Sequence, residues 1–221
     1  MGNFAIAFVG RVGSSYLEGL LASHPDVTCF GEFLSHPPVS EGTAVEVAAH
    51  LDRAVRNATT AVVGFKLPFC SLPLPSGILE TLAARDYRFV HLQRDNKLDQ
   101  FLSMRLAQVN NAWRSDIGTY AVERIHVDAG AAVVSINAFL SYETAIEEML
   151  SGTFPYLPVC YDEVVSGEAL PAILDFLGLD ERPLTSGFQR QRRGSQRDSI
   201  ANYEEIAAVL EDEGLGRFLT G

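Results

Sequence analysis

Short apolar runs alternate with longer amphipathic stretches along this chain. The apolar runs predict strands at about 3–9, 27–30, 61–67, 88–93 and 157–161. The amphipathic stretches predict helices near 14–23, 43–57, 76–85, 95–110, 135–150, 169–177 and 203–213. Strands that alternate with helices are typical of a mostly parallel sheet with helices on both faces. The pattern therefore predicts an α/β fold. It leaves 122–127 open, as either an edge strand or a loop.

The first strand, loop and helix, at 4–20, form the most informative stretch. Gly10 and Gly13 in the loop Gly-Arg-Val-Gly-Ser-Ser let the backbone turn tightly and approach a ligand. The amides at the start of the following helix then point at whatever occupies the loop, and phosphate is the natural occupant. The loop differs from a Walker A sequence because Gly13, and not a lysine, precedes Ser14. Arg11 is its one cationic side chain. Such a junction can also be purely structural.

A second stretch in which an apolar strand is followed by a helix lies at 87–103. Its apolar strand ends at Arg94, and the helix that follows carries Ser103. Taken together, the two stretches resemble the sulfotransferases that use 3′-phosphoadenosine 5′-phosphosulfate (PAPS). The first matches the R-x-G-S-S/T loop of that superfamily. The second matches the R-x-N-x-L-x-Q-x-x-S variant of its bacterial carbohydrate-type branch, with Arg94, Asn96, Leu98, Gln100 and Ser103. Weaker similarity covers most of the chain, at 64–67, 160–163, 173–179 and 199–210.

The resemblance implies a single-domain, three-layer, P-loop-like fold over residues 1–221. It also implies that the protein binds the donor PAPS through its 5′-phosphosulfate at one site and its 3′-phosphate at another. The residues that match the 5′-phosphosulfate loop are Arg11, Val12, Gly13, Ser14 and Ser15. Arg94 and Ser103 match the 3′-phosphate site. Arg193 and Gly194 match a late loop that closes over the 3′-phosphate, although a cluster of arginines there can also be a solvated surface. Either serine of the first loop can instead be only a helix N-cap.

Catalysis of sulfonate transfer needs charge stabilisation at the departing phosphate and a base for the acceptor hydroxyl. The resemblance implies that Arg11 offsets charge on the 5′-phosphate and that Glu32, just past the second predicted strand, is the base. His36 is the alternative base. Lys66 is expected either to contact sulfonate or acceptor or to form a structural ion pair. Arg11, Glu32, Lys66 and Arg94 come at the ends of predicted strands, where ligands bind in open parallel sheets.

Length, composition and charge narrow the possibilities further. The 221 residues, 47% of them hydrophobic, are enough for one sizeable core. The first apolar run is too short to span a membrane and lacks a signal-peptide cleavage site, so we expect a cytoplasmic protein. Cys29, Cys70 and Cys160 are isolated and lack metal-type spacing, which favours reduced thiols and predicts no metal. The net charge of −11 argues against nucleic acid and anionic membranes as partners.

The expected function is therefore transfer of a sulfonate group from PAPS to a hydroxyl of a carbohydrate or small metabolite. The related enzymes often dimerise, so a homodimer is a further expectation. Two alternatives remain open. One is a P-loop nucleotide-dependent kinase, which shares the strand-loop-helix logic but uses a loop lysine that this chain lacks. The other is a non-catalytic nucleotide-binding protein of the same fold.

Overall fold

The computed structural model describes residues 2–35, 39–69, 74, 77–116, 118 and 120–220. The chain forms two compact units. The first, the sheet unit, comprises Met1–Gln93 and Tyr142–Ser186, and the second, the helical unit, comprises Arg94–Ser141 and Gly187–Gly221. The single domain expected from the sequence stays a prediction.

A five-stranded sheet is the centre of the sheet unit, with the strand order β2-β3-β1-β4-β5. Every neighbouring pair of these strands is parallel. The strands are β1 (Gly2–Phe8), β2 (Val27–Cys29), β3 (Val62–Pro68), β4 (Arg88–Gln93) and β5 (Tyr156–Cys160). All five lie within one residue of the predicted bounds, so the predicted α/β fold with a parallel sheet is confirmed.

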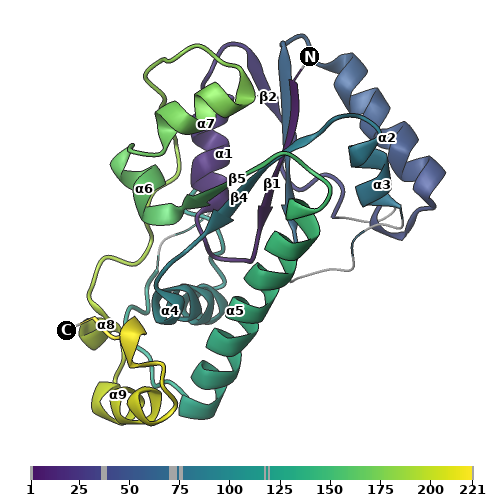
Figure 1. The fold of residues 1–221 in the computed structure, drawn as a ribbon. Helices are drawn as coiled ribbons and strands as arrows, with labels where there is room; N and C mark the ends of the chain where they lie inside the picture. The colour runs from purple at the N-terminus through teal and green to yellow at the C-terminus, as the bar shows by residue number, and fades with distance from the viewer. Residues whose placement is uncertain are drawn as a thin grey trace. The chain divides into compact units, whose positions relative to one another are not determined.

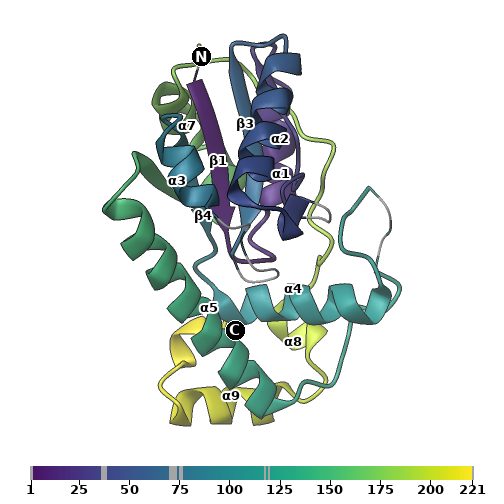
Figure 2. The same cartoon turned by 90° about the vertical axis from the view of Figure 1, so that its right-hand side faces the viewer.

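Helices cover both faces of this sheet. In Figure 1, α1 (Ser14–Ala22) and α7 (Leu170–Leu177) lie on one side of the strands, and α2 (Ala44–Asn57) and α3 (Ile78–Ala83) lie on the other. Figure 2 views the sheet unit from the side of α2 and α3. The unit also contains η1 (Val39–Glu41) and α6 (Tyr161–Ser166).

The alternation of β1 explains why two layers of helices are needed. Phe4, Ile6 and Phe8 point to the face covered by α1 and α7, and all three belong to one buried cluster with the apolar residues of those helices. The opposite face carries aromatic contacts, in which the Phe65 ring packs edge-on against those of Phe33 and Tyr87. Because both faces are apolar, each strand is buried on both sides, as parallel strands usually are.

The helical unit is built from α4 (Lys97–Asn110), α8 (Gln196–Ser199), α9 (Tyr203–Asp212) and η2 (Gly216–Phe218). Helix α5 (Ala129–Ser151) begins in this unit and ends in the sheet unit. The ambiguous stretch at 122–127 forms one isolated parallel bridge, between Ile125 and Ile200. The side-chain amide of Asn202 also links the segment at 122–127 to the start of α9. It donates to the Val127 carbonyl at 2.9 Å and accepts from the Val127 backbone amide at 3.0 Å.

The seven predicted helices are all present, and the largest difference in extent is at α5. Helix α5 starts six residues before the predicted 135, and the Asp128 carboxylate accepts a hydrogen bond at 2.7 Å from the Ala131 amide in its first turn. Helices α6 and α8 were not predicted. They have six and four residues, and a helix of so few residues shows too little amphipathic periodicity to be recognised.

By length and composition alone, α5 could cross a membrane, and it is the only helix in the described part of the chain for which this holds. The core helix of a soluble protein can have the same length and composition, so one such helix is weak evidence for a span. The expected absence of a membrane partner stays a prediction.

Gly64 on β3 provides a test of the packing on the α1 face. A Cβ at this position would lie 2.1–2.5 Å from three ring atoms of Phe4, which is fully buried. We expect Gly64→Ala to lower the free energy of unfolding by about 1–3 kcal/mol, the usual cost of overpacking a core. Urea denaturation measures this change.

The matched control is Gly152→Ala in the same unit, because a Cβ there meets no atom within 4 Å. This variant should be as stable as the unmodified protein. Equal stability of the two variants would contradict the packing described for β1 and β3.

Candidate functional site

The loop between β1 and α1 has the geometry of an anion site. Gly13 is the N-cap of α1 with φ 85°, and no side chain caps the helix. The first-turn amides therefore remain available to a ligand, where the helix dipole favours negative charge. Ser14 and Ser15 lie inside the helix, so the interpretation of either serine as an N-cap is wrong. Arg11 has φ 71°, a left-handed backbone that is costly for a non-glycine residue and that is enriched at functional sites.

Gly13 is required at this position for two reasons. Its positive φ disfavours any other residue, and a Cβ would lie 2.4 Å from two ring atoms of Tyr161, at the start of α6. The side chain of the neighbouring Val12 is fully buried in the core. Val12 can therefore contribute only its backbone to an anion in the loop.

Lys66 connects the loop with the predicted base. Its Nζ donates to Ser15 Oγ at 3.0 Å and forms ion pairs with Glu32 Oε1 at 3.1 Å and Glu18 Oε2 at 3.4 Å. The sequence placed Lys66 at the end of a strand, whereas the residue lies inside β3 and its side chain is buried. The ion pair that the sequence offered as one alternative for Lys66 is therefore present, and one of its partners is the predicted base. The contact of Lys66 with sulfonate or acceptor stays a prediction.

The backbone positions Glu32 beside β3. The Phe30 amide donates to the Gly64 carbonyl at 3.0 Å, and the Lys66 amide donates to the Gly31 carbonyl at 2.7 Å. Gly31 has φ 62°, which turns the chain away from the sheet directly before Glu32. Main-chain bonds from the two residues before Glu32 thereby hold its carboxylate next to the Lys66 ammonium.

Glu18 is a member of this cluster that the sequence did not indicate. It lies three residues after Ser15 on α1, and residues at this spacing share a helix face. That spacing is the only signal that could have identified it. Glu18 also affects the Cys29 thiol. Burial, and to a smaller extent the negative charge of Glu18, raise the pKa of this thiol to about 12, while the positive charge of Lys66 acts in the opposite direction. Cys29 therefore stays a protonated thiol near neutral pH.

The remaining predictions for the sheet unit concern other cysteines and the alternative base. Cys29 and Cys160 are free cysteines, as predicted. Cys70 and His36 lie outside the described residues. The choice of Glu32 over His36 as base stays a prediction.

In the helical unit, Asp99 of α4 gathers three arginines. Arg94 Nη2 lies 3.3 Å from Asp99 Oδ2, Arg190 Nη2 lies 3.9 Å from the same oxygen, and Arg192 Nη2 donates to Asp99 Oδ1. Arg94 and Arg192 are each 7% exposed. Gln196 Nε2 donates to Asp99 Oδ1 at 3.2 Å. Within the residues described for this unit, one carboxylate therefore faces three guanidinium groups.

The balance of charge in this cluster favours a further anion. Burial lowers the pKa of Arg192, and the neighbouring Arg190 and Arg94 act in the same direction, while Asp99 opposes them. The Nε of Arg192 is buried and has no hydrogen-bond partner. A buried donor of this kind is costly unless a ligand satisfies it. An anion with several oxygens would supply both the negative charge and the acceptors.

The second motif, at 94–103, contains residues that stabilise the fold as well as candidate ligand-binding residues. Asn96 is the N-cap of α4, and Leu98 and Gln100 are fully buried. Ser103 lies one helical turn after Asp99, so the two share a face of α4. The structure thus brings the arginine cluster and Ser103 to one face of one helix.

The late loop differs from the sequence prediction in one respect. Arg193 is exposed, whereas the adjacent Arg192 turns inward to Asp99 and donates to the Gly194 carbonyl at 3.0 Å. A run of two arginines does not indicate which side chain turns inward, so the sequence could not distinguish them. The assignments of Arg193 and Gly194 to a ligand stay predictions, and Arg192 joins them as a candidate.

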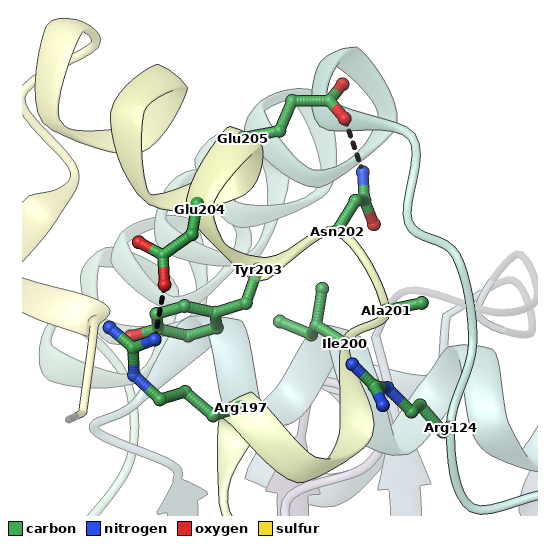
Figure 3. A pocket seen from close by; sticks show the side chains of 8 residues that line it. All are labelled: Arg124, Arg197, Ile200, Ala201, Asn202, Tyr203, Glu204 and Glu205. Carbon is green, nitrogen blue, oxygen red and sulfur yellow. Dashed lines mark hydrogen bonds and ion pairs between the residues drawn. The ribbon is translucent and has the colours of Figure 1, made fainter.

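A pocket of about 320 Å³ lies elsewhere in the helical unit, around the start of α9 (Figure 3). Its lining consists of Arg124, Arg197, Ile200, Ala201, Asn202, Tyr203, Glu204 and Glu205. Most of these residues lie within the weak similarity at 199–210, but the sequence analysis proposed no site residue there. Arg197 stacks over the Tyr203 ring at 4.4 Å and pairs with Glu204. The described residues contain no group of three or more His, Cys, Asp or Glu side chains that could hold a metal ion.

No family model and no curated protein matches the chain. Solved structures do match it. A sulfotransferase from Alicyclobacillus acidocaldarius is 16% identical with a TM-score of 0.57, over 98% of this chain and 96% of its own. The sulfotransferase domain from the curacin biosynthetic pathway is 15% identical with a TM-score of 0.53, and the match covers 97% of this chain and 92% of that domain. Mouse sulfotransferase SULT7A1, complexed with PAP, is 16% identical with a TM-score of 0.52.

The match to the mouse enzyme covers 82% of this chain, which spans 61% of that protein's length. At such low identity the three structures show a common fold. The sulfotransferase resemblance inferred from two short motifs is therefore confirmed at the level of the fold. The P-loop-like α/β architecture predicted for the chain is confirmed with it.

The Asp99 cluster leads to a prediction about stability. Asp99→Asn removes a carboxylate that pairs with both Arg94 and Arg192, whose side chains are buried. Breaking a buried ion pair in this way typically costs about 3–5 kcal/mol, so we expect a loss of that order in the free energy of unfolding. Urea denaturation with detection of helical signal measures it.

The control is Asp116→Asn in the same unit. Asp116 pairs with Arg114, but both side chains are largely solvent-exposed, and exposed pairs contribute little. If the Asp99 variant lost no more stability than the Asp116 variant, the arginines would not depend on Asp99.

Proposed function

We propose that this protein is a PAPS-dependent sulfotransferase that moves a sulfonate group to a hydroxyl of a small molecule. One observation carries the proposal. Ser15 at the anion loop and the carboxylate of Glu32 are linked by the buried ammonium of Lys66, with distances of 3.0 and 3.1 Å. The cluster therefore combines groups that bind an oxyanion with a group that accepts a proton. The shared fold with three sulfotransferases, one of them complexed with PAP, supports the same reaction.

The β1–α1 loop would bind the 5′-phosphosulfate of the donor. The uncapped amides of α1 and the hydroxyls of Ser14 and Ser15 are donors for its oxygens. Arg11 and Lys66 supply positive charge. Electrostatic stabilisation of this kind usually provides most of the catalysis when charged oxyanions exchange a group.

Glu32 would act as the general base. The acceptor oxygen attacks sulfur, the bond between sulfur and the 5′-phosphate oxygen breaks, and the hydroxyl proton passes to the Glu32 carboxylate. Adenosine 3′,5′-bisphosphate leaves with the negative charge on its 5′-phosphate, which Arg11 and the loop amides stabilise. Glu32 suits this role because its side chain is more exposed than those of Lys66 and Glu18, and it can therefore meet a substrate.

The arginine cluster on α4 would bind the 3′-phosphate. Arg94, Arg192 and Ser103 are the proposed ligands, together with Arg193 and Gly194 of the late loop. The excess of guanidinium groups over Asp99 and the unpaired Nε of Arg192 favour a polyanion at this position.

We further propose a carbohydrate or small metabolite as the acceptor, a cytoplasmic location and a possible homodimer. These parts of the proposal rest on the sequence resemblance. The kinase alternative has no support from the three structural neighbours described above, each of which is named as a sulfotransferase.

The first test compares adenosine 3′,5′-bisphosphate with adenosine 5′-monophosphate by isothermal titration calorimetry. Loss of one charge-assisted contact costs on the order of 1.5–3 kcal/mol. Arg94→Ala and Ser103→Ala should therefore weaken the bisphosphate much more than the monophosphate. Arg105→Ala is the matched control, because Arg105 is an exposed arginine on the same helix. Equal losses for both nucleotides would remove the 3′-phosphate assignment.

The second test addresses the base. Glu32→Gln keeps the shape of the side chain and removes its charge. Binding of adenosine 3′,5′-bisphosphate should stay near that of the unmodified protein, while sulfonation of an acceptor found by screening with radiolabelled PAPS falls by about 10²–10⁴. Full activity of this variant, combined with loss of activity in His36→Ala, would move the base to His36. Tight bisphosphate binding without any transfer would indicate a non-catalytic binding protein.

A further inference from the structure

The Lys66 ammonium has three oxygen partners, as many as it has N–H groups. They are Ser15 Oγ, Glu18 Oε2 and Glu32 Oε1, at 3.0, 3.4 and 3.1 Å. Ser15 and Glu18 come from α1, and Glu32 comes from the turn after β2. The ammonium is therefore held by two separate segments that flank β3.

These partners differ in how much solvent they meet. The side chains of Lys66, Glu18 and Glu32 are 6%, 17% and 34% exposed. Glu18 is the more enclosed of the two carboxylates, and its Oε1 lies 3.6 Å from the position that a Cβ on Gly31 would occupy. It is packed between α1 and the turn that carries Glu32. A substrate can thus reach Glu32 more easily than Glu18.

The placement of Glu18 is unusual for an anion site. It lies on the face of α1 that carries Ser15, one turn from amides that attract negative charge. An unpaired carboxylate at this distance would repel an anionic ligand. Its pairing with Lys66 lowers that penalty, which indicates that the two residues act together.

We propose that Glu18 is a positioning residue that serves as the fixed counter-charge of Lys66 during transfer. This inference rests on the proposed function of Glu32 as the base. When Glu32 takes the hydroxyl proton it becomes neutral, and Lys66 then needs another carboxylate in a largely buried environment. Glu18 supplies that charge, so the ammonium stays at Ser15 while the sulfonate moves. Without Glu18, Lys66 would have Glu32 as its only counter-charge, which opposes proton uptake by Glu32.

The kinetic test uses Glu18→Gln and Glu18→Asp. Gln has the shape of Glu without its charge, and Asp keeps the charge on a shorter side chain. We expect Glu18→Gln to lower kcat roughly ten- to a hundredfold, the usual scale for residues that support a catalytic group, with a small change in the KM for PAPS. Glu18→Asp should recover much of this loss. A steric role would give the opposite order, with Gln close to the unmodified enzyme and Asp slower, and would overturn the inference.

Asp52→Asn is the matched control. Asp52 lies in the sheet unit and pairs with Arg85, whose Nε lies 2.7 Å from Asp52 Oδ1. The substitution removes this ion pair, and Asp52 has no contact with Lys66 in the described structure. Its kcat should be unchanged. A fall in kcat equal to that of Glu18→Gln would mean that loss of any ion pair slows the enzyme, and would overturn the inference.

A second readout does not depend on turnover. Lys66 and Lys97 are the only lysines in the sequence, so protein made with isotope-labelled lysine has at most two ammonium signals in its NMR spectrum. The Lys66 signal, assigned by its loss in Lys66→Met, should shift in Glu18→Gln while that of Lys97 stays in place. An unchanged Lys66 signal would show that Glu18 does not hold the ammonium. Failure of the proposed function is distinct, because the unmodified protein would then neither bind adenosine 3′,5′-bisphosphate nor transfer sulfonate.

Discussion

The candidate chemistry of the sheet unit depends on one buried ammonium. Lys66 lies inside β3, and its Nζ joins the anion loop, the predicted base and a second carboxylate. A buried cation is costly unless oxygens surround it, so the positions of these side chains are constrained together. The turn at Gly31 places Glu32 on one side of the ammonium, and the uncapped start of α1 lies on the side of Ser15.

The helical unit uses the same physical device with the charges reversed. There a single carboxylate, Asp99, organises Arg94, Arg190 and Arg192, and two of these arginines are buried. In both units, buried polar and charged groups hold the candidate ligand-binding side chains in place. Preorganisation of this kind lowers the entropic cost of binding and strengthens each electrostatic contact.

Much of the fold and part of the site could be predicted from the sequence. The strands and longer helices follow from local periodicity, and the loop glycines follow from the turn that they must make. Short elements such as α6 and α8 escaped because a few residues carry no period. Glu18 and Asp99 escaped because each looks like an ordinary helix-surface carboxylate until its partners are known.

The sequence by itself therefore determined the strands, the longer helices, the α/β class and the two motifs predicted to bind anions, since each depends on neighbours a few residues apart. Tertiary structure alone decided which charges meet. The sheet order puts β3 between β2 and β1, so Lys66 lies between the turn that carries Glu32 and the helix that carries Ser15 and Glu18. Folding likewise selected Arg192, and not Arg193, to turn inward. Such choices depend on contacts between distant segments, which local patterns do not encode.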